Sequence, residues 1–286
     1  MTDAPLSSPW LVSTGWLADT LGAPDLVVVD ASWHLPTAGR DAKAEYRAGH
    51  IPGAVFFDID AIADTASGLP HMLPDPASFA AAVGALGIGD GARIVVYDSV
   101  GLFSAPRVWW TFQTFGAREV FILDGGLPKW QAEGRPVEAG EATPAPALFT
   151  PRFDASRVAS IDEVAGLLAT GTAQVADARS GERFRGEAPE PRAGLRAGHM
   201  PGARNLPFGA VVRDGRLADP AAIRAAVAAA GLDPERPIVT SCGSGVTASV
   251  IWLALDAIGA TPKALYDGSW SEWGGSDQPV ATGPAD

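Results

Sequence analysis

The sequence contains a single cysteine, Cys242, among its 286 residues. One cysteine cannot form an intramolecular disulfide or a metal site with several cysteine ligands, and such a composition is typical of a reducing compartment. Positive charge is also scarce, because 21 lysines and arginines stand against 33 aspartates and glutamates, for a formal charge of -12. A chain of this charge has no general attraction for phosphate backbones or anionic membranes, so we expect no nucleic-acid or membrane partner.

The amino-terminal segment lacks the basic residues of a targeting signal. No lysine or arginine precedes Arg40, so neither a secretory signal nor a transit peptide is expected, and we predict a cytoplasmic protein. The longest uncharged run lies between Arg236 and Asp256, but Pro237 and the Ser and Gly residues of 241–245 interrupt it. A strand, a loop and the start of a helix explain this run better than a membrane span does.

The two halves of the chain repeat each other. Segments of the first half return in the same order in the second: RAGHIPGA (47–54) as RAGHMPGA (196–203), residues 75–98 as 219–242, and LDGGLPKW (123–130) as LYDGSWSEW (265–273). We therefore predict two homologous domains, at 8–138 and 157–283, joined by a linker at 139–156 that is rich in Pro, Ala and Gly. The gapless alignment of 75–98 with 219–242 pairs Asp98 with Cys242.

Each half alternates short apolar strand patterns with helical patterns. The strand-like runs of the first half include LVVVD, RIVVYD and EVFILDG, with helix-like segments between them. Strands of this kind, separated by helices, are typical of an α/β fold whose parallel sheet is covered on both faces. Ligands bind such sheets beyond the carboxyl ends of the strands. Cys242 is predicted to lie there, because it follows IVTS and precedes the apolar stretch VTASVIWLAL.

The loop CGSGVTA, residues 242–248 and called the Cys242 loop below, has the features of a nucleophile site. A thiolate is stabilised at a helix N-terminus, where unpaired N–H groups and the helix dipole favour negative charge. Gly243 and Gly245 allow the backbone to curl, so that successive N–H groups form an anion-binding nest. A lone cysteine is more often a packing residue, but the position and the two glycines favour a catalytic one.

Two other cysteine chemistries fit this loop less well. A cysteine phosphatase needs an arginine at the sixth position after its cysteine to clamp the phosphoryl oxygens, and that position is Ala248. A papain-like protease needs a histidine base, but none of His34, His50, His71 and His199 lies in a recognisable protease motif. Sulfur transfer remains, in which the thiolate takes up a sulfane sulfur and holds it as a persulfide.

The tandem halves, the GHIPGA and GHMPGA segments, the LDGG and YDGS segments and the CGSGVTA loop resemble the two-domain rhodanese superfamily of sulfurtransferases. The resemblance covers nearly the whole chain. It implies two tandem rhodanese-like domains, each a parallel five-stranded sheet flanked by helices, with no metal or organic cofactor. Since Asp98 takes the place of Cys242, it also implies that the first domain is catalytically silent and that Asp98 caps its own loop.

The same resemblance implies a sulfur donor. CGSGVT is similar to the loop of 3-mercaptopyruvate sulfurtransferases, whereas rhodaneses that use thiosulfate have basic residues where this chain has Gly243 and Ser244. Two arginines of that group bind the carboxylate and carbonyl of mercaptopyruvate, and they match Arg183 and Arg192 in GERFRGEAPEPR. Glu182 replaces the usual glycine and is expected to point outward.

The resemblance also assigns roles around the nucleophile. Cys242 is expected to attack the donor sulfur, and Ser244, His50 and Asp41 match a proton relay. His199 is expected only to fix a turn. The remaining residues contribute backbone amides to the substrate site: Gly243, Gly245, Val246 and Thr247. The other arginines of the segment are expected at the surface or between the domains: Arg179, Arg185 and Arg196.

The persulfide is expected to pass its sulfur to cyanide or to a thiol such as reduced thioredoxin, in a ping-pong cycle.

Two rival functions stay open. A thiosulfate:cyanide sulfurtransferase would use the same loop with another donor. A non-catalytic rhodanese-like binding module would be expected to lack the cysteine, which this chain retains.

Overall fold

The computed structural model describes residues 6–260 and 262–285, which form two compact units. The N-terminal unit holds the described residues up to Asp64, together with Leu73–Asp154 and Asp214–Leu217. The C-terminal unit holds Thr65–Met72, Ala155–Arg213 and the described residues from Ala218 onward. Each unit therefore includes a short segment from the other half of the sequence.

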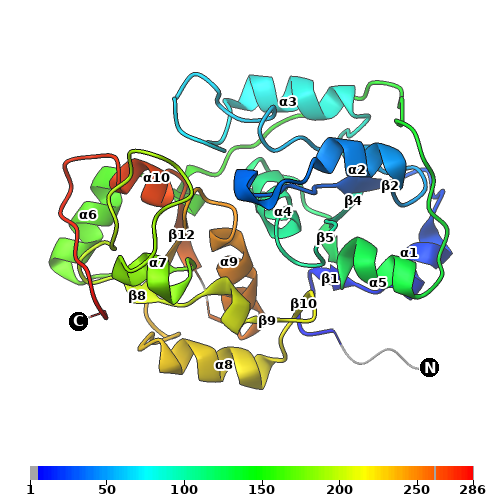
Figure 1. The fold of residues 1–286 in the computed structure, drawn as a ribbon. Helices are drawn as coiled ribbons and strands as arrows, with labels where there is room; N and C mark the ends of the chain where they lie inside the picture. The colour runs from blue at the N-terminus through cyan, green and yellow to red at the C-terminus, as the bar shows by residue number, and fades with distance from the viewer. Residues whose placement is uncertain (1–5, 261, 286) are drawn as a thin grey trace. The chain divides into compact units, whose positions relative to one another are not determined.

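A parallel five-stranded sheet in the order β1-β5-β4-β2-β3 forms the centre of the N-terminal unit (Figure 1). Its strands are β1 (Leu11–Val12), β2 (Leu26–Asp30), β3 (Val55–Phe56), β4 (Arg93–Tyr97) and β5 (Val120–Leu123). Its helices are α1 (Thr14–Thr20), η1 (Pro36–Ala38), α2 (Ala42–Ala48), α3 (Pro76–Ala85), α4 (Ala105–Thr114) and α5 (Gly126–Ala132).

Helical layers cover this sheet with aromatic side chains. Tyr97 of β4 packs in one buried cluster with Leu17 of α1 and Trp130 of α5, two helices that lie side by side in Figure 1. Phe79 of α3 and Phe112 of α4 meet edge to face in the other layer, with ring centroids 5.5 Å apart. Because β4 is buried on both faces, it reads as a continuous apolar run rather than an alternating one.

The C-terminal unit repeats this arrangement, with a parallel sheet in the order β6-β12-β11-β7-β8. Its strands are β6 (Val158–Ala159), β7 (Gln174–Asp177), β8 (Arg204–Asn205), β11 (Ile238–Ser241) and β12 (Pro262–Tyr266). Its helices are η2 (Ala155–Arg157), α6 (Ile161–Thr170), α7 (Gly181–Arg185), η3 (Phe208–Ala210), α8 (Pro220–Ala229), α9 (Ala248–Ala257) and α10 (Ser269–Trp273). Two short strands, β9 (Val212–Arg213) and β10 (Arg216–Leu217), complete the described elements. The predicted α/β class, with a five-stranded parallel sheet in each half, is confirmed.

The repeated GHIPGA and GHMPGA segments build the same turn in each unit. Nδ1 of His50 lies 2.8 Å from the carbonyl oxygen of Tyr46, and the imidazole stacks on the Tyr46 ring. Nδ1 of His199 lies 2.9 Å from the carbonyl oxygen of Phe184 and stacks in the same way on Phe184. Both histidines are buried. His199 therefore fixes a turn as expected, and His50 does the same in its own unit.

Asp98 follows β4 at the position that Cys242 occupies after β11. Its buried carboxylate accepts hydrogen bonds of 2.7–2.9 Å from five backbone N–H groups, those of Val100, Gly101, Phe103, Ser104 and Ala105. This set of groups is called the Asp98 nest below. The loop after the central strand of this fold is thus an anion-binding nest, and in the N-terminal unit a side chain supplies the anion.

We expect Asp98→Ala to lower the free energy of unfolding by roughly 2–4 kcal/mol, because it leaves several buried N–H groups without an acceptor. Asp98→Asn keeps one carboxamide oxygen in the nest and is expected to lose less. Urea unfolding of the full chain measures both changes. Wild-type unfolding midpoints for the two variants would contradict a stabilising role for the Asp98 nest.

Candidate functional site

The Cys242 loop connects the carboxyl end of β11 to the start of α9. Cys242 is 2% exposed, and Ser244 and Val246 are also buried. Gly245 has a φ of +78°, in the left-handed region that favours glycine. Thr247 is the N-cap residue of α9 and makes no side-chain capping hydrogen bond. The cysteine therefore lies where the prediction placed it, between a buried strand and a helix N-terminus.

Helix α10 holds the loop by its carbonyl groups. The N–H of Trp270 donates to the carbonyl oxygen of Cys242 at 2.9 Å. The carbonyl oxygen of Gly243 accepts from both the N–H and the hydroxyl of Ser271, at 2.9 and 2.7 Å. Because the two carbonyl groups are held by α10, the backbone at the start of the loop cannot rotate freely.

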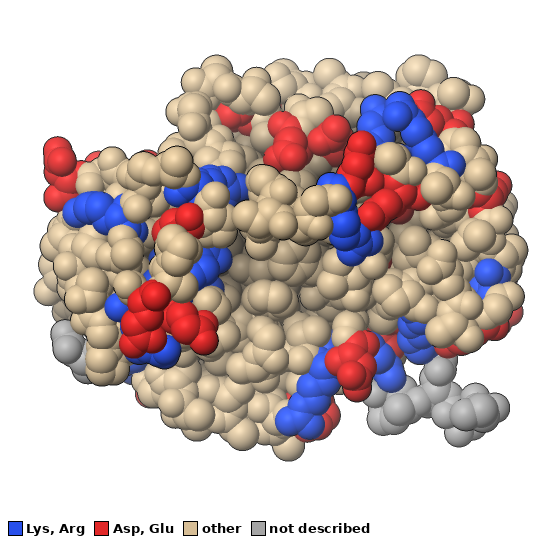
Figure 2. Space-filling view, in the orientation of Figure 1, with Lys and Arg blue, Asp and Glu red and all other residues tan. Residues whose placement is uncertain are grey.

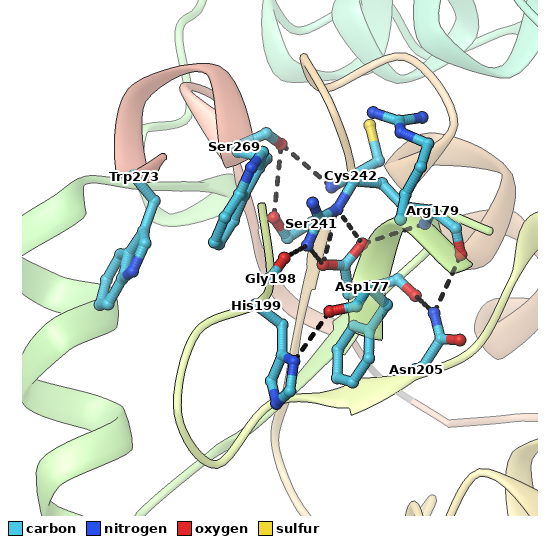
Figure 3. Close-up of polar contacts among 12 residues, drawn as sticks. Asp177, Arg179, Gly198, His199, Asn205, Ser241, Cys242, Ser269 and Trp273 are labelled. Carbon is cyan, nitrogen blue, oxygen red and sulfur yellow. Dashed lines mark hydrogen bonds and ion pairs between the residues drawn. The ribbon is translucent and has the colours of Figure 1, made fainter. Parts of the chain in front are cut away.

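Ser269 adds a hydroxyl to this support at the expense of backbone strain. Its φ is +50°, whereas its counterpart in the LDGG segment is Gly126 with a φ of +53°. The fold therefore requires a left-handed residue here, and only the C-terminal unit uses a residue with a side chain. The Ser269 hydroxyl accepts from the N–H of Cys242 at 3.1 Å (Figure 3). It also accepts from the N–H of Gly245 at 3.2 Å. Strained backbone of this kind is typical of functional sites.

Arg179 lies in a buried ion network and not at the surface, which corrects the expectation for this residue. Its Nη2 lies 2.6 Å from Oδ2 of Asp177, and its Nη1 lies 2.8 Å from Oε1 of Glu190 (Figure 3 shows the Asp177 pair). The guanidinium lies 4.1 Å above the ring of Trp270. Burial lowers the pKa of Arg179, but the Asp177 and Glu190 carboxylates outweigh it and raise the pKa above its usual value. The burial of Arg179 could not be predicted from the sequence, because this segment contains several arginines in a similar charged context.

Arg183 of α7 lies beside the Cys242 loop. A Cβ atom at Gly243 would lie 3.1 Å from Nη2 of Arg183, so the guanidinium is in contact range of the loop backbone. Glu190 pairs with Nη2 of Arg183, and its Oε1 lies 3.3 Å from Nε. Arg192 is half-buried in the same segment, and Glu182 is exposed as expected.

Ser244 has a histidine partner that sequence reasoning did not select. Nδ1 of His71 lies 3.0 Å from Oγ of Ser244 and 3.2 Å from its carbonyl oxygen. His71 is 5% exposed and has a φ of +62°, which is uncommon for a residue other than glycine. It belongs to Thr65–Met72, the segment of the first half that packs in the C-terminal unit. No local motif in the sequence marks this contact.

His50 and Asp41, the residues expected in the relay, have partners within the N-terminal unit. Both ring nitrogens of His50 have partners in the N-terminal unit, because Nε2 lies 3.4 Å from a carboxylate oxygen of Glu138 in addition to the contact at Nδ1. Asp41 is exposed and caps α2, accepting from the N–H of Ala44 at 3.0 Å. Both residues thus have structural partners, and the histidine placed against Ser244 is His71.

The part of the chain that the structure describes contains no group of three or more His, Cys, Asp or Glu side chains that could hold a metal ion. None of its helices is long and apolar enough to cross a membrane. On the face drawn in Figure 2, basic side chains lie next to acidic ones in small mixed groups.

Comparisons with known proteins agree with this geometry. The family model for the rhodanese-like domain matches residues 13–133 and 160–276. The 3-mercaptopyruvate sulfurtransferase of Escherichia coli K12 is 44% identical over 277 residues, covering 96% of this chain and 99% of that protein. The thiosulfate/3-mercaptopyruvate sulfurtransferase 1 of Arabidopsis thaliana mitochondria is 41% identical over 294 residues, covering 95% of this chain and 78% of that protein.

A solved structure gives the same result. The crystal structure of SseA from Escherichia coli, a 3-mercaptopyruvate sulfotransferase, superposes with a TM-score of 0.85 at 42% sequence identity, covering 91% of this chain and 98% of that one. The fold, the sequence repeat and these matches define a protein built from two rhodanese-like domains. The chain belongs to the rhodanese family.

Two variants of Ser269 separate its hydroxyl from its backbone strain. Ser269→Gly removes both, whereas Ser269→Ala removes only the hydroxyl, so the glycine variant should be the more stable by about 1 kcal/mol. Both should slow the reaction of Cys242 with iodoacetamide at neutral pH, because the loop loses two hydrogen bonds. Since the chain has one cysteine, the alkylation rate reports a single thiol. Wild-type rates in both variants would contradict this role.

Proposed function

We propose that the protein transfers sulfur from 3-mercaptopyruvate through a persulfide on Cys242. The observation that carries the proposal is the guanidinium of Arg183 beside Gly243, in the loop of the only cysteine. This arrangement joins a nucleophile to a cation that binds carboxylates through two parallel hydrogen bonds. The names of the Escherichia coli and Arabidopsis relatives support the same donor.

In the first half-reaction the Cys242 thiolate attacks the sulfur of mercaptopyruvate. A sulfur–sulfur bond forms, the carbon–sulfur bond breaks, and its electron pair passes to the carbon fragment, which leaves as the enolate of pyruvate. Protonation of that carbon gives pyruvate and leaves the outer sulfur on Cys242. In the second half-reaction a thiol such as reduced thioredoxin, or cyanide, attacks the outer sulfur and returns the Cys242 thiolate.

The proposed binding residues combine the contact of Arg183 with the loop and the family resemblance of Arg192. Arg183 and Arg192 are proposed to bind the carboxylate and carbonyl of the donor. The amide N–H groups of residues 243–247, including those of Gly243, Gly245, Val246 and Thr247, are proposed to stabilise the thiolate and then the persulfide. The Asp98 nest supports this assignment, because the same loop of the fold holds a full negative charge there through backbone N–H groups alone.

Ser244 and His71 are proposed to deliver the proton to the enolate. The contact of 3.0 Å between Oγ of Ser244 and Nδ1 of His71 gives the hydroxyl a partner from which it can regain a proton. This replaces the relay predicted through His50 and Asp41. The strained backbone of His71 supports a functional role, because the position is unfavourable for a residue with a side chain.

The domain roles are part of the same proposal. We assign the N-terminal domain to 8–138, the linker to 139–156 and the catalytic domain to 157–283, with the N-terminal domain silent because a carboxylate cannot carry sulfane sulfur. We place the reaction in the cytoplasm, in keeping with a chain that has one cysteine and needs it reduced. Transfer from thiosulfate is the rival activity, which the Arabidopsis relative's name also includes.

The first test incubates the reduced protein with 3-mercaptopyruvate or with thiosulfate in the absence of an acceptor. We expect mercaptopyruvate to add one sulfur atom to the intact mass and to release one equivalent of pyruvate. Cys242→Ser should show neither change. A gain from thiosulfate alone would assign the rival activity, and no gain from either donor would leave a binding module of the rhodanese fold.

The choice of histidine is tested by a matched pair of variants. His71→Asn keeps a residue that tolerates the left-handed backbone, and we expect it to lower kcat with mercaptopyruvate on the order of a hundredfold, the usual range for lost proton transfer. His50→Asn should lower the thermal midpoint but leave kcat near the wild-type value. A large loss of kcat in His50→Asn alone would restore the original assignment.

A further inference from the structure

Glu190 bridges two arginines at the edge of the Cys242 loop. Its side chain is 2% exposed, and Oε1 lies 2.8 Å from Nη1 of Arg179 and 3.3 Å from Nε of Arg183. Oε2 forms an ion pair with Nη2 of Arg183. Both carboxylate oxygens are thus engaged by guanidinium groups, and the mechanism described above does not use them.

Arg179 is the fixed end of this bridge. Its side chain is 0% exposed and is held by Asp177 and by the carbonyl oxygen of Gly198 at 2.9 Å (Figure 3). The ring of Trp270 covers the guanidinium. An arginine held on every side is not available to a substrate. What it contributes to the site is the position of Glu190.

Arg183 is the free end, because its side chain keeps 20% of its surface exposed and reaches Gly243. Glu190 holds this guanidinium through Nε and Nη2, which orients the group before any donor arrives. Such preorganisation lowers the entropy cost of substrate binding, because the guanidinium is already ordered. The same carboxylate also offsets the charge of Arg183.

The N-terminal unit lacks this network. Asp30 and Asp177 are equivalent, because each ends its strand and accepts the N–H of the residue two positions later. That residue is Ser32 in one unit and Arg179 in the other. Without an arginine, burial raises the pKa of Asp30. The paired charges therefore occur in the unit that carries the cysteine.

We propose that Glu190 is a positioning residue that also selects the donor by its charge. It holds Arg183 against the Cys242 loop, and it balances the charge of the ion network: Asp177 and Glu190 supply two negative charges, and Arg179 and Arg183 supply two positive ones. A doubly charged anion such as thiosulfate is repelled by Glu190 twice as strongly as a single carboxylate is. This proposal rests on the proposed sulfur transfer and explains its preference for mercaptopyruvate.

The test is Glu190→Gln, which keeps the size of the side chain and removes its charge. We expect kcat/KM for thiosulfate, relative to kcat/KM for mercaptopyruvate, to rise about three- to tenfold, the effect of one nearby charge at the effective dielectric of a partly buried site. Glu187→Gln is the matched control, since Glu187 pairs with Arg185 in the same segment but is solvent-exposed. Its donor ratio should stay at the wild-type value. An unchanged ratio in Glu190→Gln would overturn the proposal.

A second measurement does not depend on sulfur transfer. Iodoacetate carries one negative charge and iodoacetamide carries none, and both alkylate the single cysteine. Glu190→Gln should raise the ratio of the iodoacetate rate constant to the iodoacetamide rate constant at least threefold over wild type. The reason is again the loss of charge repulsion, which acts only on iodoacetate. If the wild-type protein takes sulfur from neither donor, the proposed function fails, and this ratio still decides the role of Glu190.

Glu190→Asp covers the case in which the glutamine variant does not fold. It keeps the charge but is one methylene shorter, so it should weaken the grip on Arg183. We expect its KM for mercaptopyruvate to rise at least threefold, with kcat and the donor ratio near wild type. A merely structural residue would instead lower kcat and the thermal midpoint together, and that outcome, or an unchanged KM, would overturn the positioning role.

Discussion

The orientation of the peptide groups that follow β11 is the constraint on which the site depends. A peptide plane carries its carbonyl and its N–H on opposite sides, so the capture of one sets the direction of the other. The first turn of α10 fixes these carbonyl groups, since Trp270 donates to the carbonyl oxygen of Cys242 and Ser271 donates to that of Gly243. The N-terminal unit makes the corresponding bond from Leu127 to the carbonyl of Asp98. The conformation of the loop backbone is therefore common to both units and does not depend on whether the first loop residue is Cys242 or Asp98.

Charge is added to this loop in a balanced form. The N-terminal unit satisfies its loop with the Asp98 carboxylate, whereas the C-terminal unit adds two acid–arginine pairs in the segment beside its cysteine loop. A buried guanidinium without a partner would be strongly unfavourable. Pairing lets Arg179 be buried and leaves Arg183 partly exposed. The difference between the two units thus lies in a few side chains on a common backbone.

Much of the fold could be predicted from the sequence, because its signals are local. The strand and helix patterns, the repeat and the glycines of the Cys242 loop all lie in continuous stretches, and they place Cys242 correctly. His71 was missed because its contact with Ser244 depends on a segment that packs in the unit of the other half. The burial of Arg179 was missed because a charge-rich segment gives no sign of which arginine is enclosed by carboxylates and an aromatic ring.

His50 illustrates the limit of a repeated motif. The sequence repeat drew attention to both histidines, yet repetition of the residue in a unit without a cysteine already indicates a task unrelated to catalysis. Each histidine stacks on an aromatic ring and fixes one end of a turn. A repeat is therefore a guide to what the fold needs, and the differences between its copies are the guide to chemistry.

The single cysteine also determines how a catalytic cycle can end. Many thiol enzymes release a bound sulfur or an oxidised sulfur by attack from a second cysteine of the same chain, which leaves an internal disulfide. This chain has no second thiol. Sulfur held on Cys242 must wait for a molecule that arrives from solution, so the lifetime of the loaded state would follow the concentration of the acceptor. The protein would then act as a sulfur store whose discharge rate is set by its surroundings.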